Sequence, residues 1–98
     1  MNKERLRKLA QHLDKMAPEK FDMGTWCGMP CCIGAHAQRL FRLKVGGVAK
    51  YLDIEDKDYA LFLPSRRTGA YDATPKQAAK VIRHLIKHGV VDWERFVK

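Results

Sequence analysis

The sequence contains no long apolar run, no low-complexity tract and no recognisable catalytic motif. No stretch approaches the roughly 20 apolar residues that a membrane-spanning helix needs, and the N-terminal segment MNKERLRKLAQ lacks the apolar core of a signal peptide. Nucleophile-elbow, phosphate-loop, paired-carboxylate and dinucleotide-binding patterns are also missing. We therefore expect a cytoplasmic protein that is not an enzyme, needs no cofactor and does not enter a membrane.

Alternating apolar and polar residues, the pattern of a half-buried strand, are also absent over any useful length. The chain has 98 residues, of which 46% are hydrophobic and 31% charged, which suits one folded domain with a single core. These features predict an all-α fold: a compact single-domain bundle of about five short helices that spans residues 1–98.

The clearest helix signal lies between Thr74 and Gly89. Thr74, followed by Pro75 and Gln77, forms a capping-box start with proline at the first helical position, and Gly89 is a typical stop. Apolar residues at three- and four-residue steps predict a second long helix over 2–16. Further helices are expected over 30–43, 48–52 and 55–63, with single turns at 18–21 and after Asp92.

Positive charge dominates the composition. Nineteen Lys and Arg residues against eleven Asp and Glu give a formal net charge of +8. Such an excess accelerates association with anionic partners and makes the affinity fall as salt rises. The favoured partner is therefore a nucleic acid or an acidic protein or nucleoprotein surface. The alternative is that the charge only keeps a small protein in solution.

Four of these cations fall on one face of the helix predicted at 74–89. At 100° per residue they lie within a narrow arc opposite the apolar residues, and His84 and His88 flank them. Like charges along one ridge repel each other, so their clustering favours an anionic ligand over a merely solvated surface. The predicted partner-binding residues are Lys76, Lys80, Arg83 and Lys87, with Arg66 and Arg67 of the preceding loop as an extension.

Three cysteines, Cys27, Cys31 and Cys32, lie within six positions and are followed by His36. Zinc could take Cys27, Cys32 and His36, or Cys27 and Cys32 with His84 and His88, but neither set has the paired short spacings typical of zinc modules. The two-residue spacing of redox-active cysteines is also absent. We expect the cysteines to fill a narrow space where a loop meets the helix predicted at 30–43.

A helix-turn-helix spacing is present at 49–59. Ala49, Ile54 and Tyr59 occupy the small and apolar positions of that motif, and Asp53 stands where its turn usually has glycine. The second helix would then begin with three carboxylates among residues 55–58, which oppose contact with phosphates and are typical of a helix start. The spacing alone does not predict a DNA reader.

The segment CGMPCCIGAHA resembles the pattern C-G-T-x-x-C-x-x-G-x-A of small uncharacterised bacterial and phage-type helical proteins. Cys27, Gly28, Cys32 and Ala37 match, whereas Met29 departs from the usual threonine. KFDMGTW, YLDIEDKDYALFL and the helix that starts at Thr74 are similar to further stretches of these proteins, so the resemblance covers about residues 21–86. It implies a helical fold and a cytoplasmic origin, and it implies no reaction.

Three functional hypotheses follow. The leading one is a small, basic, non-catalytic interaction module that binds an anionic macromolecule through the cationic helix face. The second is a phage-type inhibitor or adaptor, such as an anti-defence protein, that docks on a host protein complex. The third is a zinc-binding module that uses Cys27, Cys32 and histidine residues.

Overall fold

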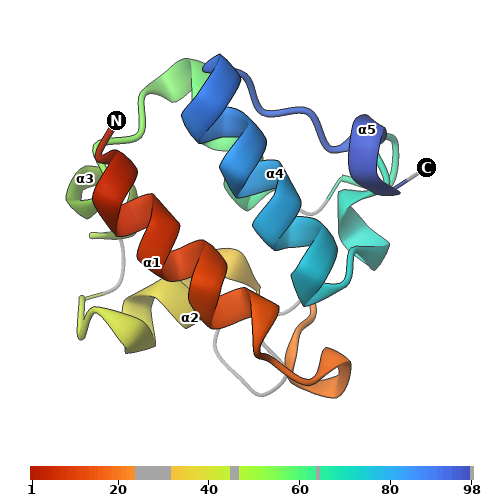
Figure 1. Cartoon of the computed structure of the whole chain (residues 1–98), viewed down its shortest axis with the longest axis horizontal. Coiled ribbons are helices and arrows are strands. Elements are labelled where there is room, and N and C mark those ends of the chain that lie inside the picture. The colour runs from red at the N-terminus through yellow and green to blue at the C-terminus, as the bar shows by residue number, and fades with distance from the viewer. Residues whose placement is uncertain (24–31, 45–46, 64, 98) are drawn as a thin grey trace.

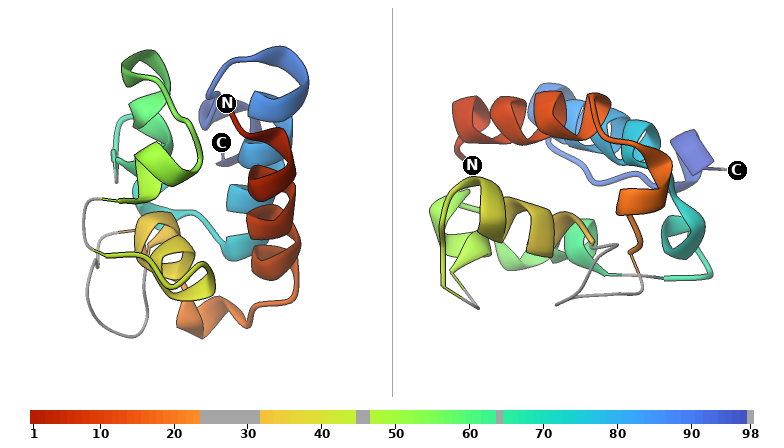
Figure 2. Two further views of the ribbon diagram at one scale, coloured as in Figure 1. Left: turned by 90° about the vertical axis from the view of Figure 1, so that its left-hand side faces the viewer. Right: turned by 90° about the horizontal axis from the view of Figure 1, so that it is seen from below.

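Two long helices lie side by side and form one layer of the molecule. The computed structural model describes residues 1–23, 32–44, 47–63 and 65–97. Helices α1 (Lys3–Asp14) and α4 (Pro75–His88) run antiparallel along each other (Figure 1). Figure 2 shows the second layer on their inner side. That layer contains α2 (Ile33–Leu40), α3 (Val48–Tyr51) and the 3-10 helix η2 (Asp56–Phe62), and the short elements η1 (Pro18–Lys20), η3 (Ala70–Asp72) and α5 (Glu94–Val97) complete the fold.

Capping residues at the ends of α1 and α4 set the limits of these helices. Asn2 caps α1, since its Oδ1 accepts a hydrogen bond from the Arg5 N–H at 3.0 Å. At the start of α4, the Thr74 N–H donates to Gln77 Oε1 at 2.8 Å and the Gln77 N–H donates to Thr74 Oγ1 at 3.1 Å. Gly89 ends α4 in the left-handed region at φ 73°. The sequence prediction for this helix is confirmed, and α1 lies within the predicted 2–16.

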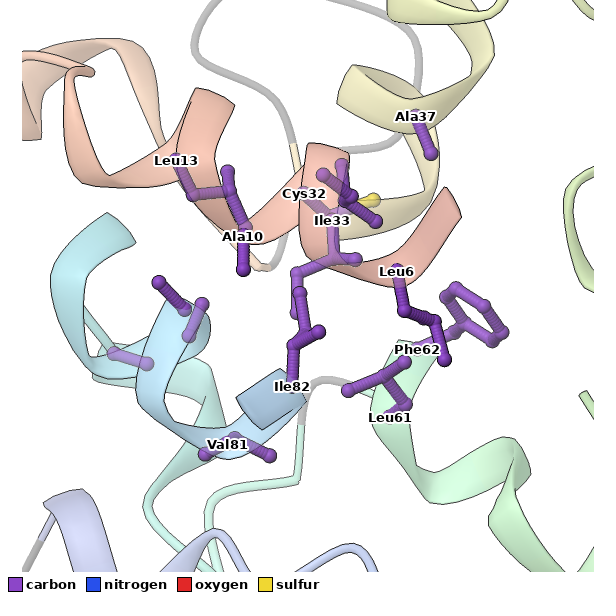
Figure 3. Packing of buried hydrophobic residues seen from close by; sticks show 14 of the residues in the cluster. Leu6, Ala10, Leu13, Cys32, Ile33, Ala37, Leu61, Phe62, Val81 and Ile82 are labelled. Atoms are coloured by element: carbon purple, nitrogen blue, oxygen red, sulfur yellow. The ribbon is translucent and has the colours of Figure 1, made fainter. Parts of the chain in front are cut away.

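The core lies between the two layers. Figure 3 shows side chains of α1, α2 and α4 projecting into the same space, with Cys32 beside Ile33 at the start of α2. Cys32 is only 2% exposed and belongs to the core, as expected for a packing role. Cys27 and Cys31 lie outside the described residues. The radius of gyration of 11.8 Å is close to the value of about 13 Å for a folded domain of 100 residues, so the protein is one compact all-α domain.

The second predicted helix is shorter than expected. The sequence predicts helix over 30–43, ended by Gly46 and Gly47, whereas α2 ends at Leu40. Arg42 adopts φ 56°, and the Leu43 N–H donates to the Gln38 carbonyl at 2.8 Å across the last turn. This closure satisfies the terminal carbonyl groups with a non-glycine residue in the left-handed region. Residues 30–31 lie outside the described part of the chain.

The segment with helix-turn-helix spacing folds differently from that motif. Asp53, at φ 56°, takes the left-handed conformation for which the motif usually has glycine, and α3 stops before it. The following element, predicted over 55–63, is a 3-10 helix in which Tyr59 is 47% exposed and Asp58 is buried. Because the apolar position of a recognition helix packs against the first helix, this arrangement does not build one.

The C-terminal segment after α4 connects the two layers. Trp93 is buried, and its Nε1 donates to the Ala60 carbonyl at 3.0 Å. Asp92 caps the final turn as predicted, since its Oδ1 accepts from the Arg95 N–H at 3.3 Å. None of the helices described is long and apolar enough to cross a membrane.

Candidate anion-binding surface

The predicted cations form an exposed ridge on the outward side of α4. Lys76, Lys80, Arg83 and Lys87, called here the α4 ridge, are all exposed, whereas the apolar residues on the opposite side of the helix are buried. Eleven residues separate the two ends of the ridge, which corresponds to about 16 Å at 1.5 Å per residue. The 3.6-residue period therefore produces the aligned row of charge that the sequence predicts.

One carboxylate of the chain partly neutralises the ridge. Asp14, at the end of α1, forms an ion pair with Arg83. The hydrogen bond from Arg83 lowers the pKa of the Asp14 carboxyl, the charges of Arg83, Lys76 and Lys80 lower it further, and desolvation opposes these effects. A lowered pKa keeps Asp14 ionised at neutral pH, and its contribution to stability is lost only as the pH falls through that pKa. Arg83 therefore reaches a ligand less freely than the three lysines do.

The side of α1 that faces α4 brings further cations. Arg7 is seven residues from Asp14 and Lys3 is eleven, so both lie on the same side of α1 as Asp14, near whole helical turns. Both side chains are exposed. The sequence prediction missed these two residues and Asp14, because their relation to the ridge depends on how α1 packs against α4. The α1 pattern alone shows only that they are polar.

Arg66 and Arg67 are exposed, as expected, in the turn before η3. The Arg66 guanidinium lies 4.6 Å from the centre of the Tyr71 ring, over its face. This turn lies near α5 at one end of the molecule (Figure 1). Among the described residues, no hydrogen bond or ion pair joins either arginine to the α4 ridge, so their predicted contribution stays a prediction.

The histidines that flank the ridge pair with each other. The rings of His84 and His88 are 4.5 Å apart, and Phe96 of α5 meets His84 edge-on at 5.7 Å. A shallow hollow of about 250 Å³ lies here, and Lys80, Arg83 and Lys87 also line it. This side of α4 thus places two further nitrogen-bearing rings beside the lysines.

His36, predicted as a possible zinc ligand together with the cysteines, is held by contact with a backbone carbonyl group. His36 is 4% exposed, and its Nε2 lies 2.8 Å from the Lys20 carbonyl oxygen, in hydrogen-bond contact. The described residues include no group of three or more His, Cys, Asp or Glu side chains that could hold a metal ion. Both predicted zinc sets include Cys27, which lies outside those residues, so zinc binding stays a prediction.

Compared with known proteins, the chain matches no family model, no curated protein and no solved structure.

Proposed function

We propose that the protein is a non-catalytic, cofactor-free module that binds the phosphate backbone of a nucleic acid through the α4 ridge. The observation that carries the proposal is the exposed alignment of Lys76, Lys80, Arg83 and Lys87 on one well-capped helix. Lys3 and Arg7 widen the positive surface on the neighbouring helix. The net charge of +8 supports the same class of partner.

The chemistry of the ridge favours binding without sequence specificity. Phosphate contacts carry no sequence information, and lysine ammonium groups make such contacts as point charges without a fixed hydrogen-bonding geometry. Arg83 is the one arginine of the ridge, and Asp14 already engages it. A ridge of about 16 Å spans roughly five base pairs at 3.4 Å each, which is enough for several phosphate contacts.

The test measures the affinity for a duplex DNA of arbitrary sequence over a range of salt concentrations. We choose the double substitution Lys76→Glu/Lys87→Glu because it leaves the Arg83–Asp14 pair intact. Its effects on the helix dipole also offset each other, since Glu is favourable near the start of α4 and unfavourable near its end. We expect binding to weaken at least about tenfold and the slope of log K against log salt to fall by about two.

The matched control is Lys44→Glu/Lys50→Glu, which changes the net charge equally with exposed residues of the other layer. The control should keep most of the affinity and most of the salt slope. Equal losses in both variants would show that only net charge matters, and unchanged binding by the ridge variant with an unchanged circular dichroism spectrum would refute the proposal.

Docking on a protein partner is the second candidate function. Tyr59 and Leu63, on and just after η2, are 47% and 49% exposed, and exposed large apolar side chains are typical of protein contacts. A phage-type inhibitor or adaptor would use such a surface, and its binding would respond weakly to salt. Salt-insensitive binding that Tyr59→Ser/Leu63→Ser abolishes would favour this candidate over the first.

A further inference from the structure

A second basic surface lies on the other side of α1. Between the end of α1, η1 and α2 there is a hollow of about 460 Å³, whose polar lining includes His12, Lys15, Lys20 and Arg39. A neighbouring hollow of about 430 Å³ shares His12 and Lys15 and extends along α1 to Lys8. We call the two together the α1–α2 groove. It is separate from the α4 ridge, which occupies the outward side of the other long helix.

Charge in the groove is of one sign. No Asp or Glu is among the described residues that line either hollow. Asp14 is adjacent to Lys15 in sequence, but it turns to the opposite side of α1 and pairs with Arg83. The contact between α1 and α4 thus removes the carboxylate that would otherwise offset Lys15. Within the described lining, the groove cations therefore face no carboxylate, whereas Asp14 offsets part of the charge of the ridge.

A buried polar contact holds the wall of the groove in place. His36 of α2 is linked through Nε2 to the Lys20 carbonyl of η1 at 2.8 Å. Its ring also stacks on Phe21, with centroids 6.0 Å apart and planes inclined by 12°. This contact fixes η1, which carries Lys20, against α2, which carries Arg39. A wall that is already ordered reduces the entropy lost when a ligand binds.

Apolar side chains complete the lining of the first hollow. Met16, Ala17 and Leu40 contribute to the first hollow, and Leu40 is 38% exposed although it is a large hydrophobic residue. A volume of about 460 Å³ lies within the range of about 300–1,000 Å³ found for small-molecule sites. The groove therefore suits a ligand that combines several negative charges with an apolar group.

We infer that the α1–α2 groove binds a nucleoside phosphate. The phosphates lie against Lys15 and Lys20, and the base lies on Met16 and Leu40. This function goes beyond the proposed contact with a nucleic acid backbone, because it uses different residues and a different face. Neither proposal requires the other.

The experiment titrates the full chain with ATP, without divalent cations, and follows backbone amide signals by NMR. Inorganic triphosphate and adenosine are titrated separately. We expect ATP to shift signals of residues 12–20 and 36–41, and to bind at least about tenfold more tightly than either fragment, since each end supplies part of the affinity. In Lys15→Gln/Lys20→Gln we expect a loss of affinity for ATP of about tenfold or more.

Two matched variants make the result specific. Lys76→Gln/Lys87→Gln removes the same charge from the α4 ridge and should leave the affinity for ATP within about twofold of the parent. Leu40→Ser changes an exposed side chain and should weaken ATP binding while leaving triphosphate binding unchanged. The inference is overturned if ATP shifts mainly signals of α4, if triphosphate binds as tightly as ATP, or if both lysine variants lose affinity equally. None of these results bears on duplex binding by the ridge, which is measured separately.

Discussion

The two layers of the molecule are specified in different ways. We call the layer of α1 and α4 the outer layer and the layer of α2, α3 and η2 the inner layer. In the outer layer, α1 and α4 have 12 and 14 residues, and Asn2, Thr74 and Gly89 at the ends of these helices set their limits. The inner layer is built from short helices that depend on distant parts of the chain. For example, Arg5 of α1 donates to the Tyr51 carbonyl of α3 at 2.8 Å and lies over the Tyr51 ring. The limits of the long helices are thus set by local residues, whereas the short helices depend on tertiary contacts.

A charged contact shows the same dependence in η2. Asp58 of η2 is 5% exposed, and Lys57 donates to its Oδ2 at 3.0 Å. Lys57 also donates to the carbonyl of Gly89, the residue that ends α4, at 3.4 Å. The hydrogen bond to Asp58 raises the pKa of the Lys57 ammonium, so its charge persists further into the alkaline range. The short helix η2 is thereby joined to the end of the long one.

The largest expected effect comes from the contact between the layers. Leu85 of α4 is fully buried, and Leu85→Ala would remove its side chain from the core. We expect the free energy of unfolding to fall by about 2–5 kcal/mol, with both layers unfolding together. Urea unfolding followed by circular dichroism measures it. A loss below about 1 kcal/mol would show that the layers do not share one core.

A smaller effect is expected where η2 loses its hydrogen bond to the C-terminal segment. Trp93→Phe removes the hydrogen bond to the Ala60 carbonyl and part of a buried ring. We expect a loss of about 1–2 kcal/mol in the same urea experiment, with amide exchange accelerated in η2 more than in α4. Tyr59→Phe, at an exposed position of η2, is the control and should change stability by less than about 0.5 kcal/mol. Uniformly accelerated exchange would contradict the distinction between the layers.

The smallest effect concerns Arg42 and Asp53, non-glycine residues of the inner layer that adopt left-handed backbone conformations. Arg42→Gly relieves backbone strain and, after the added entropy of the unfolded chain, should stabilise by about 0.5 kcal/mol. Asp53→Gly should give no gain, because Asp tolerates this conformation better and because its Oδ2 also accepts from the Met1 ammonium at 2.9 Å. Precise thermal unfolding of both variants measures the difference. An equal gain in stability in both variants would show that the Met1 contact does not stabilise the protein.

Sequence reasoning predicted the outer layer better than the inner one for the same physical reason. Capping residues and the 3.6-residue period are local, so the limits of α4 and its exposed ridge could be predicted from 74–89 alone. The end of α2 could not be predicted in this way, because Arg42 adopts a left-handed conformation for which glycine is the usual sequence signal. The Asp14–Arg83 pair joins residues 69 apart, and the α1–α2 groove needs two helices in contact. Both follow only from packing.

The pairing of α1 with α4 also affects how the chain is made. Roughly sixty residues separate the end of α1 from the start of its neighbour. A ribosome adding about 5–20 residues per second needs about 3–12 s to synthesise that stretch. During this interval Leu6, Leu9 and Leu13, which are fully covered in the finished fold, have no α4 to shield them. The nascent chain therefore passes through a stage in which these leucines are exposed and can associate with other apolar surfaces.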